Sequence, residues 1–182
     1  MSNAKKYTMG QASHTANLGT EHIFNFLQNQ KSTVKVVNVE SDIEYQKKDI
    51  DLIWVREING EIRETTIEIK VDNYYRTGNY FFETLSNVER GTDGCFMYSE
   101  AKYLFYYFLN VELHVFNLAK AREWFIANRN RFKLVKTSTP INSFGDVYHT
   151  EGALVNRATF AKEYEGKLYT YPYTNDWSVK RS

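Results

Sequence analysis

Cysteine and proline are scarce in this chain of 182 residues, which has one cysteine and two prolines. The single cysteine, Cys95, excludes an internal disulfide and a multi-cysteine zinc site, and it is typical of a reducing compartment, so we expect a cytoplasmic protein. The longest apolar run, residues 103–109, is far too short to span a bilayer, so we expect no membrane partner. No repeat, low-complexity run or proline-rich linker divides the chain, which predicts one folded domain.

The composition favours a domain of the α/β class. Hydrophobic residues make up 42% of the chain, enough for a real core with a shielded polar site. The net charge of +1 decides little, because a nucleic-acid-binding protein needs a local basic surface rather than a basic total. We expect residues 1–16, which open with Met-Ser-Asn-Ala, to be a tag remnant and flexible N-terminus without a signal sequence. Residues 17–165 would form the domain, and residues 166–182 a Tyr-rich C-terminal tail.

Local patterns predict an order of helices and strands. Helices are predicted over 17–30, 99–109 (with Ser99 as N-cap) and 118–130. Strands are predicted over 34–40, 80–88, 111–117 and 147–155, with another strand from Lys133. A further short segment is predicted over 157–164. The 80–88 segment also fits a helix, but its aromatic content favours a strand. A helix, a strand meander and then alternating helices and strands predict a mixed central sheet flanked by helices.

Between two strand-like runs stands Asn59-Gly60, the strongest short-range signal for a two-residue type I′ turn. Such a turn sets the pairing of the two strands, so that Asp51 lies opposite Glu68. Lys70 then points to the same side of the sheet. The other side would carry apolar residues: Ile50, Leu52, Trp54, Ile67, Ile69 and Val71.

Two directly opposed carboxylates repel each other, which a purely structural hairpin would avoid. A divalent cation removes this conflict, and carboxylate, water and phosphate oxygens are the ligands that Mg²⁺ prefers. The Lys70 ammonium could orient an attacking water or stabilise charge on a phosphate. The opposite interpretation is an exposed hairpin face whose charged side chains serve only solubility.

These residues resemble the signature of a known family. Asp51, followed after the hairpin by Glu68-Ile69-Lys70, is similar to the Asp…Glu-X-Lys motif of the PD-(D/E)XK nuclease superfamily. The resemblance implies a restriction-endonuclease-like fold and phosphodiester hydrolysis with Mg²⁺ or Mn²⁺. It implies that Asp51 and Glu68 hold the metal and that Lys70 activates water. Asp49 competes with Asp51 as the ligand, and the predicted register favours Asp51. Glu21 matches the first-helix acid of many members.

A second resemblance follows the hairpin. Thr77-Gly78-Asn79, then Phe82-Glu83, a Gly-containing loop and Ser99-Glu100-Ala101 are similar to phage and mobile-element nucleases of this superfamily. This resemblance implies that Glu83 is a further catalytic residue and metal ligand. The implied partner is DNA, with Lys48 and Arg76 as candidate phosphate contacts. Cutting both strands of a duplex would favour a homodimer.

Two other functions stay open from the sequence. The chain could be a catalytically inactive nucleic-acid-binding module with the same fold, or a protein-interaction module whose Tyr-rich tail docks a partner. Metal binding that depends on the carboxylates distinguishes the nuclease from the inactive module. Truncation after Glu165 would reveal the docking role if association is lost while metal binding is kept.

Overall fold

The structure is a computed structural model that describes residues 9–140 and 147–179. Its helices are α1 (Met9–Gln28), α2 (Ile43–Gln46), α3 (Cys95–Tyr98), α4 (Leu118–Asn128) and α5 (Arg157–Glu163), with 3-10 turns η1 (Tyr75–Thr77), η2 (Arg129–Arg131) and η3 (Asn175–Ser178). Its strands are β1 (Thr33–Asn38), β2 (Leu52–Ile58), β3 (Glu61–Asp72), β4 (Asn79–Asn87), β5 (Thr92–Asp93), β6 (Tyr103–Phe108), β7 (Glu112–Asn117), β8 (Lys133–Pro140), β9 (Val147–Asn156) and β10 (Tyr169–Pro172). Among the described residues, no helix combines the length and apolar character needed to cross a membrane.

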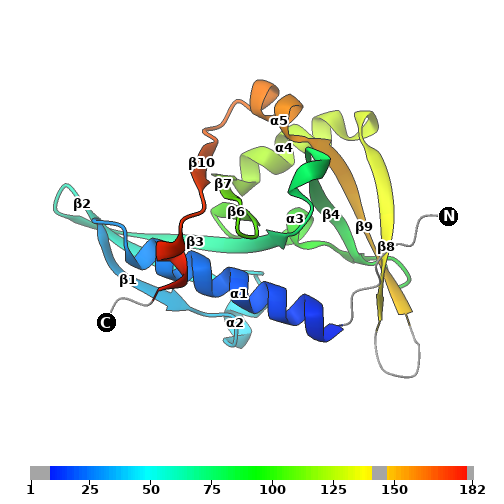
Figure 1. The fold of residues 1–182 in the computed structure, drawn as a ribbon. Coiled ribbons are helices and arrows are strands. Elements are labelled where there is room, and N and C mark those ends of the chain that lie inside the picture. The colour runs from blue at the N-terminus through cyan, green and yellow to red at the C-terminus, as the bar shows by residue number, and fades with distance from the viewer. Residues whose placement is uncertain (1–8, 141–146, 180–182) are drawn as a thin grey trace.

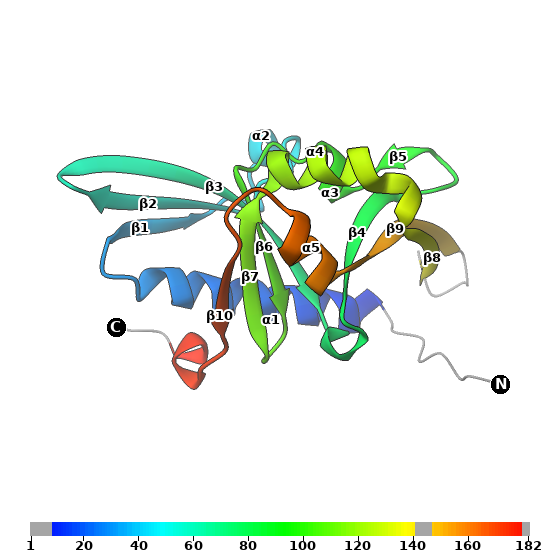
Figure 2. The same cartoon turned by 90° about the horizontal axis from the view of Figure 1, so that it is seen from above.

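The described strands form two sheets, and the fold is mixed α/β with flanking helices (Figure 1). The main sheet has six strands in the order β1-β2-β3-β6-β7-β10, and the second has four in the order β5-β4-β9-β8. Strands β3 and β6 pair in parallel, whereas β2 and β3 form an antiparallel hairpin. Helix α1 lies on one side of the main sheet, and α3, α4 and the second sheet lie on the other (Figure 2).

The β2–β3 hairpin confirms the predicted turn. Asn59 and Gly60 have φ values of 55° and 78°, the positive angles that a type I′ turn requires. The ladder runs from Ile58 opposite Glu61 to Leu52 opposite Ile67, which is the predicted register. Ile50 departs from the prediction.

Ile50 was expected beside Leu52, but it packs in the core on the opposite side of the main sheet. The preceding residue, Asp49, has a φ of 53°, in the left-handed region. This turn of the chain ends the strand alternation before β2 begins, so residue parity no longer predicts the face. Ile50 therefore belongs to the aromatic core around Phe82 and Phe96, not to the core beneath α1.

The predicted helix over 99–109 is wrong, because Tyr103–Phe108 forms strand β6. Residues Leu104 to Phe108 are all buried. A central strand covered on both faces has a continuous apolar run instead of an alternating one, and such a run cannot be separated from a buried helix by period alone. Ser99 is not the N-cap of a helix: it follows the last residue of α3 as its C-cap, and its Oγ donates to the backbone oxygen of Asp49 at 2.8 Å. The strand predicted over 80–88 is confirmed as β4.

Both ends of the predicted domain extend further into the fold than expected. Helix α1 begins at Met9, eight residues before the predicted start at Asn17. Within the predicted Tyr-rich tail, β10 pairs with β7, and Trp177 is buried with 5% of its surface exposed. Asn25 in α1 donates a hydrogen bond to the backbone oxygen of Trp177 at 2.9 Å. Described residues of the tail therefore belong to the folded domain.

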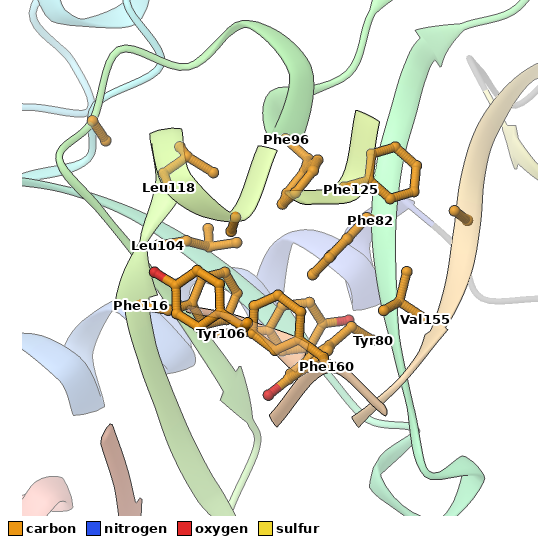
Figure 3. Close-up of a cluster of buried hydrophobic side chains, with 14 of the residues drawn as sticks. Tyr80, Phe82, Phe96, Leu104, Tyr106, Phe116, Leu118, Phe125, Val155 and Phe160 are labelled. Atoms are coloured by element: carbon orange, nitrogen blue, oxygen red, sulfur yellow. The ribbon is translucent and has the colours of Figure 1, made fainter. Parts of the chain in front are cut away.

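An aromatic core joins the main sheet to the second sheet and to α3 and α4 (Figure 3). The rings of Phe82 in β4 and Phe96 in α3 stack with centroids 4.0 Å apart, and Phe125 in α4 meets both edge-on. Such ring contacts add to the stabilisation from burial itself. Because this packing holds α3 against β4, it also sets the positions of Glu83 and Cys95, the sequence neighbours of Phe82 and Phe96.

Candidate metal centre

Asp51 and Glu68 meet where β2 begins. The backbone N–H of Asp51 donates to the Ile67 oxygen at 2.9 Å, and the N–H of Ile69 donates to Asp51 Oδ2 at 2.7 Å. The carboxyl groups of Asp51 and Glu68 lie close enough for each to change the pKa of the other. The hairpin turn therefore brings together the two acids whose proximity the sequence predicted.

Glu68 is a buried acid without full compensation. Only 6% of its surface is exposed, and among the described residues its Oε2 has no hydrogen-bond partner. Burial raises the pKa of Glu68 well above its ordinary value, and the charges of Asp51 and Asp49 raise it further. A buried carboxylate in this position needs a proton or a cation to be stable.

The surroundings of Asp51 also raise its pKa. Burial raises the pKa of Asp51 to about 6, against the opposing effect of the Ile69 N–H. Glu40 and Asp49 add to the rise because their negative charges disfavour another anion nearby. A positive charge placed among these acids would lower each pKa and stabilise the ionised forms.

Lys70 supplies one positive charge beside this group. Its Nζ lies 3.0 Å from Glu83 Oε2, and the two side chains are 28% and 14% exposed. Burial by itself would lower the pKa of Lys70, but the neighbouring Cys95, Glu83 and Glu68 outweigh burial and raise it above its usual value. Lys70 is therefore an ammonium at neutral pH. Glu83, the further acid that the sequence singled out, is thus the nearest acidic partner of Lys70.

Sequence reasoning gave Asp49 second place and missed Cys95. Asp49, Glu68 and Cys95 each present a donor atom, and these three atoms lie within 4.8 Å of one another. Asp49 Oδ1 accepts a hydrogen bond from the Tyr98 hydroxyl at 3.1 Å, whereas its Oδ2 is buried without a partner among the described residues. Burial raises the pKa of Asp49 and of the Cys95 thiol. No local pattern marks Cys95, because α3 reaches Glu68 only through tertiary packing.

The first helix contributes a different contact from the predicted one. Glu21 is exposed, and among the described residues it is not one of the groups that shift the pKa of Asp49, Asp51 or Glu68. The adjacent Thr20 instead donates to Glu40 Oε1 at 3.1 Å, and Glu40 is one of the acids that raise the pKa of Asp51. The sequence feature that could have pointed to Glu40 is its position just after β1, whose last residue pairs with Leu52 at the start of β2.

The two candidate phosphate contacts occupy different places. Lys48 and Arg76 are both exposed. Lys48 directly precedes Asp49, so it lies at the rim of the acidic group. Arg76 lies in η1, on the connection that leads from Lys70 in β3 to Glu83 in β4. Lys48 therefore borders the candidate site. Arg76 instead lies on the connection between β3 and β4, shortly before β4 begins at Asn79.

In comparisons with protein-family models, curated proteins and solved structures, we found no significant match to this chain. Functional inference therefore depends on the residues and their geometry.

Proposed function

We propose that this protein is a metal-dependent nuclease that hydrolyses DNA phosphodiester bonds. The observation that carries the proposal is the buried Glu68 carboxylate, which lies among Asp51 and Asp49 and beside the Lys70 ammonium. A cluster of acids that contains an unpartnered buried oxygen lowers the stability of the fold, because each buried charge costs free energy unless it is compensated. The same group is suited to a divalent cation.

The donor atoms fit the ion that the proposal requires. Asp51 and Glu68 would hold Mg²⁺ or Mn²⁺, with Glu83 as a further ligand, and carboxylate oxygens suit either cation. A bound ion supplies Lewis acidity at the phosphate and lowers the pKa of coordinated water. The unpartnered Glu68 Oε2 supports this fit, because coordination would satisfy an atom that the described protein leaves without a partner.

The remaining residues have roles that follow from their charge. The Lys70 ammonium would hydrogen-bond the attacking water or a non-bridging phosphate oxygen, where negative charge grows in the transition state. Glu83 holds Lys70 in place at 3.0 Å. Lys48 at the rim would contact the DNA backbone, and Arg76 would do so further along.

The strand arrangement supports a restriction-endonuclease-like fold as part of the same proposal. Helix α1 precedes an antiparallel meander of β1, β2 and β3, and β3 then pairs in parallel with β6. Asp51 directly precedes β2, and Glu68 lies within β3. This order agrees with the one that the Asp…Glu-X-Lys resemblance implies.

The test is cleavage of plasmid and single-stranded DNA with Mg²⁺, Mn²⁺ or EDTA. Wild type should cut with metal and not with EDTA, and Glu68→Ala and Lys70→Ala should each lower the rate by about 10²-fold or more, the usual effect of removing a positioned acid–base group. Glu57→Gln and Lys31→Ala are matched controls, because both side chains are exposed outside the site. Equal inertness of wild type and both site variants on both substrates would reject the nuclease in favour of the inactive binding module.

A further inference from the structure

We propose that Asp49, Glu68 and Cys95 form a mixed carboxylate–thiolate site that binds Zn²⁺, or Co²⁺ as its spectroscopic substitute, in preference to Mg²⁺. The inference rests on the proposed function, because it assigns the identity of the cation at the same acidic group. It differs in adding a sulfur donor and in giving Asp49 a ligand role.

The geometry of the three donors is compact. Their atoms lie within 4.8 Å of one another, although they come from the loop before β2, from β3 and from the first residue of α3. Tetrahedral zinc with oxygen and sulfur ligands requires donor atoms about 3.5 Å apart, given metal–ligand bonds of about 2.0–2.3 Å. Small side-chain rotations would close the remaining gap, and a water or phosphate oxygen would complete the coordination.

Independent evidence for a ligand comes from unpartnered buried atoms. Glu68 is 6% exposed, and its Oε2 has no hydrogen-bond partner among the described residues. Asp49 Oδ2 is buried and unpartnered in the same way. Native proteins rarely leave such atoms unsatisfied without a bound ion or water. A cation among the three donors would satisfy both oxygens at once.

Cys95 contributes charge as well as a donor atom. Burial raises the pKa of the Cys95 thiol and disfavours the thiolate, whereas the nearby Lys70 ammonium favours it. On metal binding the S–H proton leaves to solvent and an S–metal bond forms, so uptake should release a proton. Three anionic donors would then be largely balanced by the divalent cation and the Lys70 ammonium.

The donor set determines which cation is preferred. Carboxylates alone suit Mg²⁺ and Mn²⁺, whereas a thiolate favours softer ions such as Zn²⁺. A single cysteine is sufficient here because the carboxylates supply the other donors. Since Cys95 is the only cysteine in the sequence, any thiolate–metal signal from the protein must come from this position.

The experiment is a titration of metal-free full-length protein with Co²⁺ under anaerobic conditions, followed by near-ultraviolet absorption. Wild type should develop a thiolate-to-cobalt charge-transfer band that saturates at one equivalent. Cys95→Ser should lack the band, and Asp49→Asn and Glu68→Gln should weaken Co²⁺ binding by at least about tenfold, since even outer-shell changes can cost that much. Glu57→Gln should behave as wild type. Excess Zn²⁺ should abolish the band, whereas excess Mg²⁺ should not.

Three outcomes would overturn the inference: no band in wild type, a band whose affinity is unchanged in both Asp49→Asn and Glu68→Gln, or displacement of Co²⁺ by a modest excess of Mg²⁺. The second would mean that a lone thiol binds cobalt. Circular dichroism of Cys95→Ser and Cys95→Ala in EDTA checks that each variant folds, and either one suffices for the comparison.

The outcome is separable from that of the nuclease proposal. Mg²⁺-dependent DNA cleavage in wild type and Cys95→Ser alike, with no cobalt band, would leave the nuclease standing and reject the mixed site. A carboxylate-dependent band without cleavage by any cation would support the mixed site and reject the nuclease.

Discussion

The ammonium of Lys70 in β3 lies 3.0 Å from the carboxylate of Glu83 in β4, so this ion pair joins the main sheet to the second sheet. Both side chains are largely shielded from water, and the pair borders the acidic group around Glu68. Lys70 therefore has two sets of acidic neighbours, one in each sheet. The single positive charge of Lys70 therefore interacts both with Glu83 and with Glu68.

Glu83→Gln should destabilise the metal-free protein by about 1–3 kcal/mol, because a partly buried ammonium loses its nearest partner. Equilibrium unfolding in denaturant with EDTA measures the change. The double variant Lys70→Met/Glu83→Gln should cost less than the sum of the single changes, because neither charge is then left alone. Additive free energies in this cycle would show that the pair contributes nothing to stability.

Glu68→Gln should stabilise the metal-free protein at pH 8, because burial and the charges of Asp51 and Asp49 all disfavour the ionised form of Glu68 and raise its pKa. The same variant should lose the stabilisation that wild type gains from added Mn²⁺ or Zn²⁺. Thermal unfolding with EDTA and with each metal measures both effects. A variant that is less stable than wild type in EDTA, or equally responsive to metal, would contradict the expectation.

The Asp51 carboxyl predicts a particular pH dependence. Its pKa is raised from 3.8 to about 6, so the folded state binds this proton more tightly than the unfolded state does. The resulting stability is fully present below pH 3.8 and is lost as the pH rises through about 6. Relative to wild type, Asp51→Asn in EDTA should therefore gain stability between pH 4 and 7, by up to about 3 kcal/mol. Denaturant unfolding at several pH values measures the difference, and a pH-independent difference would argue against the shift.

Gly94, the residue directly before α3, lies close against the backbone of Glu83 in β4. A Cβ at this position would lie 2.6 Å from both the backbone oxygen and the Cγ of Glu83. Gly94→Ala should therefore destabilise the protein by about 1–3 kcal/mol and displace Glu83 from Lys70, because the backbone cannot move aside cheaply. Thermal unfolding measures the cost, with exposed Thr92→Ala as the control. Equal stability of the two variants would mean that α3 is loosely held.

The C-terminal segment should matter for folding itself. Trp177 is 5% exposed and its ring packs against Phe26 and Tyr107, at 4.5 and 5.7 Å between centroids. Trp177→Ala should lower the free energy of unfolding by about 3–5 kcal/mol, as large-to-small changes in a core do. Denaturant unfolding tests this, with the exposed Val179→Ala as control. A cost below that of the control would return this segment to the role of a docking tail.

The amino-acid sequence alone determined the hairpin and, through it, the meeting of Asp51 with Glu68. This was possible because Asn59-Gly60 is a local signal and a two-residue turn sets the register of every pair beyond it. Strand β4 was also readable from its aromatic content. Strand β6 was not, because burial on both faces removes the alternation that distinguishes a strand from a helix.

Only the tertiary structure decided which groups join Glu68 from other parts of the chain. Asp49 reaches it through a left-handed turn, and Cys95 reaches it because Phe96 stacks on Phe82 and holds α3 against β4. The exposed position of Glu21 was decided in the same way, by how α1 packs on the sheet. These placements depend on contacts between residues distant in the chain, and no local pattern in one sequence contains that information.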